Sequence, residues 1–297
     1  MTDHASDIPD DGPLAGLLTA LDLTDTGART SEDISTGPSQ WMPMGRVFGG
    51  QVLAQSLVAA MRTTEADRRP HSMHGYFLRP GDVTKPITFS VDRIHDGRSF
   101  STRRTQAYQD GRPILSMIAS FQDADEGLEH QAPMPEGIPQ PESLPSARDV
   151  LSRIDHPVAA HWANDRPFDM RHVEQPVYFG AAPDRVAHQA VWVRAIGRLP
   201  DDPAVHLASL AYASDYSILE SIYRRHGLSW ATPGIKAASL DHAMWFHRFG
   251  RADEWMLYVQ ESTSAQGGRG LSLGRIYSRD GVLLASVAQE GMVRVPR

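Results

Sequence analysis

The spacing of apolar residues predicts two kinds of element in the first half of the chain. Over residues 51–62 apolar residues recur at helical spacing, with small residues between them that permit close packing, so we expect a helix. A shorter apolar helix is expected over residues 14–21. Residues 73–122 instead alternate apolar and polar positions, as in residues 87–91, which is typical of strands. A helix wrapped by a curved antiparallel sheet is the natural assembly of these parts.

The same pattern then occurs a second time. Residues 77–81 (Phe-Leu-Arg-Pro-Gly) and 246–250 (Phe-His-Arg-Phe-Gly) open two similar stretches. Each stretch continues to an Asp-Gly turn signal, at Asp110 and at Asp280, between alternating segments. Self-similarity on this scale indicates two tandem copies of one α+β unit.

In the second copy a clear strand is expected over residues 190–194, after a start near residue 168. We expect its helix to begin at Ser214 and Asp215, with the apolar face over residues 218–223. The remaining strands are expected over residues 236–246, 254–261, 270–277 and 282–289.

Changes of composition divide the chain into four parts. The start is acidic and polar, unlike a signal peptide, and is expected to be disordered. A stretch rich in proline and acidic residues predicts an extended linker, with a short helix near residues 147–154. Earlier in the chain, an irregular loop is expected over residues 36–45. The expected parts are a disordered segment 1–12, a first unit 13–127, a linker 128–160 and a second unit 161–297.

Composition narrows the classes of function. Of the 297 residues 41% are hydrophobic, which is enough for a sizeable core, and the net charge of −7 argues against nucleic acid as a partner. The absence of cysteine excludes disulfides, thiolate metal sites and a cysteine nucleophile, and fits a cytoplasmic location. No apolar run reaches the ~20 residues that a membrane helix needs, so no membrane span is expected.

Three polar residues are candidates for chemistry as a set. Asp215 could merely cap its helix, but the matching helix start of the first copy, residues 48–51, has no acid. A residue that the fold requires should occur in both copies, so the difference favours a carboxylate that activates water. Ser239 and Gln289 lie in strands, where the plain alternatives are a locally bonded hydroxyl and an amide that faces solvent. If Gln289 faces the helix instead, it must be hydrogen-bonded.

Two other patterns are rejected. Residues 270–274 (Gly-Leu-Ser-Leu-Gly) match the nucleophile elbow, which needs a strand followed by a helix, whereas a strand and a hairpin follow here. His242 and His247 are five residues apart and so lie on opposite faces of a strand, which argues against a metal site. We expect neither a metal nor a cofactor.

Four blocks along both copies resemble bacterial acyl-CoA thioesterase II. They are residues 46–51 (Arg-Val-Phe-Gly-Gly-Gln), 74–82 (His-Gly-Tyr-Phe-Leu-Arg-Pro-Gly-Asp), 240–247 (Leu-Asp-His-Ala-Met-Trp-Phe-His) and 289–291 (Gln-Glu-Gly). The resemblance implies a double hotdog, in which two helices are each wrapped by a curved antiparallel sheet and the sheets are joined. It also implies hydrolysis of medium- to long-chain fatty acyl-CoA to free fatty acid and coenzyme A.

The resemblance also implies site residues. The family's acid, hydroxyl and amide map to Asp215, Ser239 and Gln289, although the family's hydroxyl is commonly threonine. A thioester is reactive enough for direct attack by water, so Asp215 would accept a proton while the other two hold the water in place. Amide groups at a helix start could polarise the carbonyl. The residues expected to bind substrate are Gly49, Gly50, Gln51 and His74.

Two alternatives remain open beside this reading. A non-catalytic double hotdog that binds acyl-CoA would keep the cleft and could lose any of the three polar residues. A hotdog hydratase would carry histidine five residues after the acid, where this chain has Glu220. We also expect a homo-oligomer formed through packing of the sheets.

Overall fold

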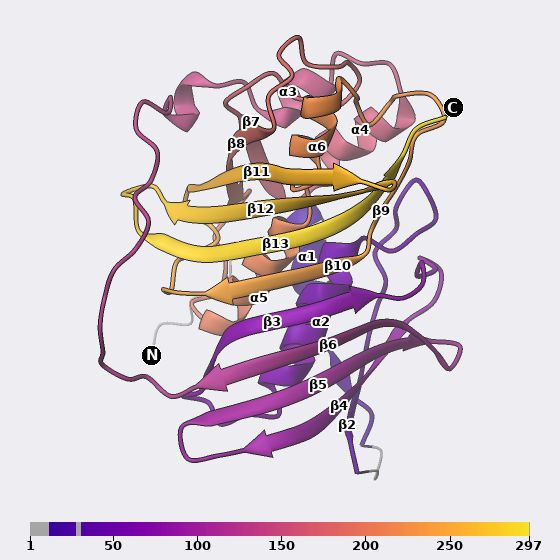
Figure 1. Ribbon diagram of the computed structural model, residues 1–297. Helices are drawn as coiled ribbons and strands as arrows, with labels where there is room; N and C mark the ends of the chain where they lie inside the picture. Colours follow the sequence, from indigo (N-terminus) through magenta and orange to yellow (C-terminus); the bar gives the residue numbers. More distant parts are fainter. Residues whose placement is uncertain (1–11, 28–30, 297) are drawn as a thin grey trace.

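The computed structural model describes residues 12–27 and 31–296. The segment expected to be disordered, residues 1–12, therefore lies outside the described residues except for Gly12. Among the described residues, neighbouring strands pair antiparallel in one continuous sheet (Figure 1). No helix within these ranges has the length and apolarity needed to cross a membrane.

The sheet consists of two halves with the same strand order, which run outward from a central pair. The first half comprises β3 (Arg69–Phe77), β6 (Arg112–Gln122), β5 (Phe100–Gln109), β4 (Ile87–Asp96), β2 (Asp33–Gly37) and β1 (Thr24–Asp25). The second comprises β10 (Asp241–Phe246), β13 (Leu283–Arg294), β12 (Arg269–Ser278), β11 (Met256–Gln266), β8 (His188–Ala195) and β7 (Phe168–His172), with β9 (Lys236–Ser239) paired to β13. The halves join where β3 pairs with β10. The expected pair of sheet-wrapped units, joined through their sheets, is confirmed.

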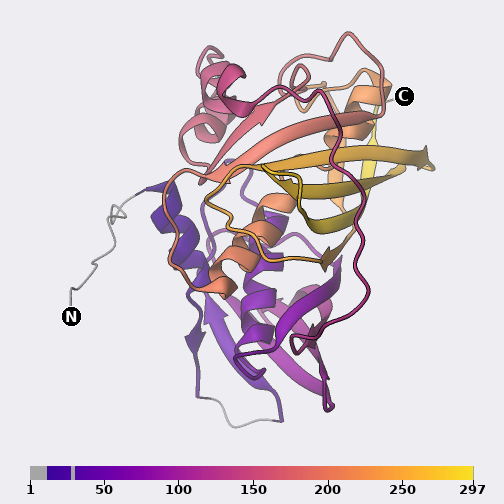
Figure 2. The same ribbon diagram turned by 90° about the vertical axis from the view of Figure 1, so that its left-hand side faces the viewer.

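Two long helices pack side by side on one face of the sheet (Figure 2). These are α2 (Gly49–Met61) and α5 (Pro203–Ser214), with α1 (Pro13–Leu21) beside them. The start of α2 meets the end of α5, because Gly50 lies against the Tyr212 carbonyl. The expected helices over residues 14–21 and 51–62 are confirmed.

The expected start of the second helix at Ser214 and Asp215 is wrong. Helix α5 ends at Ser214, and a shorter helix, α6 (Glu220–His226), begins six residues later. Asp202 caps α5 by accepting a hydrogen bond from the Ala204 amide, and Pro203 follows at the first helical position. The middle of α5 is buried on all sides, so it lacks the amphipathic period by which sequence reasoning finds helices.

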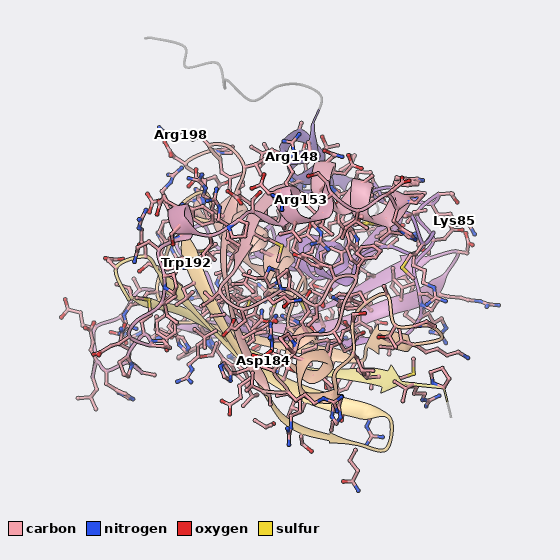
Figure 3. All side chains as sticks on the ribbon, turned by 90° about the horizontal axis from the view of Figure 1, so that it is seen from above. Lys85, Arg148, Arg153, Asp184, Trp192 and Arg198 are labelled. Atoms are coloured by element: carbon pink, nitrogen blue, oxygen red, sulfur yellow. The ribbon has the colours of Figure 1, made fainter. Side chains whose placement is uncertain are left out.

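The segment between the halves is more structured than expected. It contains η1 (Pro141–Ser143), α3 (Ala147–Leu151) and α4 (Pro157–Asn164); α3 was expected and α4 was not. In the loop expected over residues 36–45, the first two residues instead belong to β2. Seen from above (Figure 3), the exposed Arg148 and Arg153 project from the α3 side.

The stretch before η1 runs along the outer face of the second half. The Trp192 indole donates to the Pro139 carbonyl at 2.9 Å, and the Tyr277 hydroxyl donates to the Pro133 carbonyl at 3.1 Å. Both side chains belong to a small apolar cluster separate from the main core. This stretch therefore covers the outer face of β8 and β12 and leaves the outer face of β3 and β10 open.

Candidate active site

The structure brings Asp215, Ser239 and Gln289 together. Asp215 follows the last residue of α5, Ser239 ends β9, and Gln289 lies in β13, which pairs with β9. The Gln289 amide donates to Asp215 Oδ1 at 2.9 Å and to Ser239 Oγ at 2.8 Å. The Ser239 hydroxyl donates to the same Asp215 oxygen at 3.3 Å. The three side chains thus form one connected hydrogen-bonded cluster.

The start of α2 completes this cluster from the other half of the chain. The Gly50 amide donates to the Asp215 carboxylate. A Cβ atom on Gly49 would lie 2.7 Å from Asp215 Oδ2, and one on Gly50 would collide with the Tyr212 carbonyl oxygen. The two glycines therefore allow the helix start to approach the carboxylate, and the site is built from both copies.

The environment gives Asp215 the proton affinity of a base suited to neutral pH. Its burial in the protein raises the pKa of Asp215 to about 6, although hydrogen bonds from Gln289, Gly50 and Ser239 act in the opposite direction. A carboxylate with a pKa just below neutral is still ionised at pH 7 and accepts a proton more readily than an ordinary aspartate.

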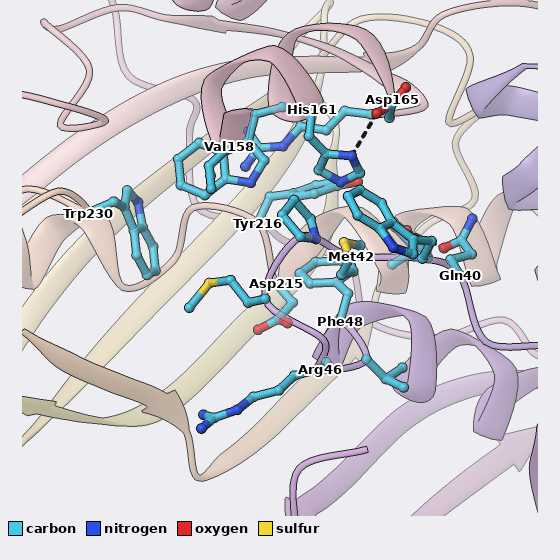
Figure 4. Close-up of a pocket in the computed structure, with 18 of the residues that line it drawn as sticks. Gln40, Met42, Arg46, Phe48, Val158, His161, Asp165, Asp215, Tyr216 and Trp230 are labelled. Carbon is cyan, nitrogen blue, oxygen red and sulfur yellow. Dashed lines mark hydrogen bonds and ion pairs between the residues drawn. The ribbon is translucent and has the colours of Figure 1, made fainter. Parts of the chain in front are cut away.

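A cavity of about 600 Å³ opens from Asp215 and Ser239 (Figure 4). Its walls are mostly apolar, with aromatic residues from several elements, and Phe48 stacks on Tyr216 with ring centroids 4.7 Å apart. Trp230 lies on one side of Asp215, and His161, whose Nδ1 lies 2.7 Å from Asp165 Oδ2, lies on the other (Figure 4). The lining also includes Trp41, Met42, Met44, Val47, Val158, Trp162 and Leu219.

Two cations face this apolar space. Arg46 lies near Asp215 (Figure 4) and is exposed. The Arg166 guanidinium lies over the rings of Trp162 and Tyr216, at 4.7 and 4.8 Å from their centroids. Apolar walls with a few fixed polar groups are typical of sites for small organic ligands.

Two of the expected substrate-binding side chains lie away from the cavity. The Gln51 side-chain amide is buried and donates to the Pro38 carbonyl at 2.8 Å, while its oxygen accepts from the backbone N–H of Gln40 at 3.1 Å. It therefore holds the segment that lines the cavity and does not itself line it. His74 lies on the exposed outer face of β3, edge-on to Trp245, because side chains alternate along the strand and its neighbour Met73 faces the core. Gly49 lines the cavity.

Sequence reasoning gave His242 no role, yet it is fully buried behind Gln289. Its Nδ1 contacts Gln289 Oε1, and its Nε2 lies 2.9 Å from Ser214 Oγ. The period of two along β10 could have placed it, since Met244 and Phe246 also face inward.

Glu220, the position at which a hydratase would carry histidine, is also buried. His172 contacts its carboxylate at 3.0 Å and the Trp230 indole donates to it at 2.9 Å. Burial acts to raise the pKa of Glu220, but these partners outweigh burial and lower it. Its carboxylate is thus held by structural partners. The described residues contain no group of three potential ligands that could hold a metal.

Comparison with known proteins covers both halves. Residues 38–122 match the family described as acyl-CoA thioesterase N-terminal domain, and residues 160–292 match the family described as acyl-CoA thioesterase. The chain is 38% identical to acyl-CoA thioesterase 2 of Haemophilus influenzae over 88% of this chain and 92% of that protein. It is also 38% identical to human acyl-coenzyme A thioesterase 8, over 89% and 85%.

Solved structures support the same family and fold. The crystal structure of acyl-CoA thioesterase II TesB2 from Mycobacterium marinum superposes with a TM-score of 0.75 at 40% identity, covering 95% of this chain and 98% of that one. A hot dog fold protein from Alicyclobacillus acidocaldarius has a TM-score of 0.77 at 20% identity, over 95% and 99%, which supports the fold alone. The chain therefore belongs to the acyl-CoA thioesterase II family.

Proposed function

We propose that this chain hydrolyses medium- to long-chain fatty acyl-CoA to free fatty acid and coenzyme A by direct attack of a water molecule. The observation that carries the proposal is the cluster of Asp215, Ser239 and Gln289 at the wall of an apolar cavity, beside the start of α2. The family relationship supports the same reaction, since its relatives are named acyl-CoA thioesterases.

Each side chain has a part in this reaction. Ser239 and Gln289 bond to Oδ1 of Asp215, while Oδ2 is directed toward Gly49. Together with Asp215 they hold the attacking water in place. Asp215 accepts a proton from the water while the water oxygen attacks the thioester carbonyl carbon. The positive end of α2 stabilises the oxyanion that forms. When the carbon–sulfur bond breaks, the leaving thiolate takes the proton from Asp215, and the carboxylate is restored.

The cavity favours a fatty acyl chain as the group that is bound. About 600 Å³ of mostly apolar space accommodates an alkyl chain, and burial contributes ~0.8 kcal/mol for each CH₂ group. The exposed Arg46 beside Asp215 places a cation where an anionic carrier would leave the cavity.

A thiol-release assay over acyl-CoAs of graded chain length tests the proposal. We expect coenzyme A release to rise with chain length until the cavity is filled. Tight binding without release would favour the non-catalytic alternative. Formation of hydroxyacyl-CoA from an enoyl-CoA would favour the hydratase, although Glu220 is held by His172 and Trp230.

The open outer face of the sheet supports a homo-oligomer as a further part of the proposal. Tyr76 on β3 is 63% exposed and Ile118 on β6 is 48% exposed, and Trp245 of β10 lies on the same face. Ile118→Glu should shift the mass measured by light scattering toward the monomer. Ile196→Glu, an exposed change elsewhere, is the control. A cytoplasmic location stays a prediction that rests on the absence of cysteine.

A further inference from the structure

We infer that His242 and Ser214 are positioning residues: together they hold the Gln289 amide in the one orientation in which its NH₂ group faces Asp215 and Ser239. The inference rests on the proposed role of Gln289 in the reaction. The inference extends the active site by a line of hydrogen-bonded side chains, which runs from the end of α5 through β10 to β13 and ends at Asp215 and Ser239.

The contacts form a continuous and fully buried line. Ser214 is the last residue of α5, and its Oγ lies 2.9 Å from His242 Nε2 and 2.8 Å from the Ala211 carbonyl oxygen. The other ring nitrogen, Nδ1, contacts Gln289 Oε1. Ser214, His242 and Gln289 have essentially no exposed surface, so bulk water does not replace any of these partners.

Counting donors and acceptors fixes the direction of every bond. An ionised Asp215 only accepts hydrogen bonds, so Gln289 must present its NH₂ group to it and its oxygen to His242. The His242 Nδ1 must then carry a hydrogen. A neutral imidazole carries only one, and burial lowers the pKa of His242 to about 4, so the ring is neutral at pH 7.

The direction of the Ser214 hydrogen bond follows from the tautomer of His242. With its hydrogen on Nδ1, the ring has a bare Nε2 that needs a donor, and the Ser214 hydroxyl is the group in reach. The hydroxyl therefore donates to Nε2, in competition with the Ala211 carbonyl oxygen that it also contacts. The direction of each hydrogen bond in the line is thus fixed by the preceding one, and the side-chain amide of Gln289 cannot flip.

The repeat within the chain offers an internal comparison. The residue of the first copy that matches His242 is Met73, since each lies four residues before the phenylalanine that opens its stretch. The residue that matches Gln289 is Ala119, since each lies nine residues after the aspartate of the Asp-Gly turn. Met73 and Ala119 face each other across β3 and β6 and are fully buried. The fold therefore accepts apolar residues at both positions, and the polar pair belongs to the half that carries Asp215.

Substitution of His242 gives the first test. Asparagine can place an NH₂ group near the position of Nδ1, whereas leucine cannot donate. We expect His242→Leu to lower kcat on the order of 10²-fold with little change in KM, because a small misplacement of reacting groups has this effect. His242→Asn should recover most of the loss. Ser214→Ala should also lower kcat, and Ser221→Ala, a buried serine on α6 bonded to Ser272, serves as the matched control.

The background variant Gln289→Ala separates positioning from packing. If His242 acts through Gln289, His242→Leu should cost little further kcat once Gln289 is alanine. An equal loss of kcat in both backgrounds would overturn the inference. A Gln289→Ala variant with full kcat would instead remove the proposed role of Gln289.

A measurement on the unmodified protein does not depend on any variant's folding or kcat. In protein labelled with ¹⁵N-histidine, His242 should show a proton on Nδ1 and a bare Nε2 at pH 7, with its signals identified by their loss in His242→Asn. Ser214→Ala should leave the proton on Nδ1, which still faces the Gln289 oxygen, and should change the ¹⁵N chemical shift of Nε2, which loses its donor. A proton on Nε2 in the unmodified protein overturns the inference, whatever the kinetics show.

Discussion

Two opposing influences act on the Asp215 carboxylate: the surrounding protein partly encloses it, and Gln289, Ser239 and Gly50 donate hydrogen bonds to it. Enclosure favours its neutral form, and these donors favour its charged form. Enclosure prevails, so the carboxylate becomes a stronger base. The missing acid in the first copy singled out Asp215, and the resemblance to acyl-CoA thioesterase II added Ser239 and Gln289. A single buried histidine such as His242 carries no comparable signal.

Asp215→Asn removes the base while its shape is nearly kept. We expect kcat to fall ~10²–10⁴-fold, because this is the usual contribution of general-base catalysis. Thiol release under saturating substrate is the measurement, and circular dichroism checks that the fold is retained. Turnover equal to that of the unmodified chain would leave Asp215 with a structural role only.

The pH dependence of the unmodified enzyme should follow the same group. Only ionised Asp215 accepts a proton, so kcat should be constant above its pKa of about 6 and fall about tenfold for each pH unit below it. Buffers of constant ionic strength from pH 5 to 8.5 give the profile. An acid limb centred near pH 4, the ordinary range of aspartate, would contradict the effect of burial.

The stability of the folded state should fall as pH rises, over the same range in which kcat rises. The folded pKa of Asp215 is raised above its ordinary value of 3.8, so between pH 4 and 6 the folded state binds more protons than the unfolded state. The contribution of Asp215 to stability is therefore greatest below pH 4 and is lost as pH rises through about 6. Relative to the unmodified chain, Asp215→Asn should gain ~1–3 kcal/mol of unfolding free energy from pH 4 to 7.5, measured by urea denaturation.

At the scale of elements, the site depends on two helix ends that meet. The start of α2 and the end of α5 lie together, so the positive end of one helix faces the negative end of the other. The strands and α2 could be predicted because their apolar periods are clear. The true limits of α5 and α6 could not, because α5 is buried all round and the break holding Asp215 has no glycine or proline to mark it.

Gly49→Ala tests how closely the helix start must approach. The new Cβ would lie 2.7 Å from Asp215 Oδ2 and 3.0 Å from the Phe77 ring, so either the carboxylate or the helix must shift. We expect kcat to fall on the order of 10²-fold. Gly127→Ala, where no atom lies within 4 Å, should leave kcat unchanged and is the control.

At the scale of the whole molecule, the candidate active site draws on both units. The second unit supplies Asp215, Ser239 and Gln289, while the first supplies the start of α2 and has no acid in its own first helical turn. The repeat itself was predictable from the sequence. Its assembly was not, because the pairing of β3 with β10 depends on contacts between residues more than a hundred positions apart.

One catalytic site per chain is the expected stoichiometry. Titration of a tight, non-hydrolysable acyl-CoA analogue, followed by residual activity, should reach its end point at one equivalent. Loss of activity at two equivalents, in two equal steps, would mean that the first unit also works. Asp215→Asn should lower the total turnover ~10²–10⁴-fold and not merely by half.

The joining of both units in one chain has a genetic consequence. In an assembly of two identical chains, every substitution appears at both symmetric positions, so a polar residue needed at one site must also be tolerated at the other. Here Met73 and Ala119 can remain hydrophobic while His242 and Gln289 are polar. Mutations at these matching positions can therefore be selected separately, for chemistry in the second half and for a stable core in the first half.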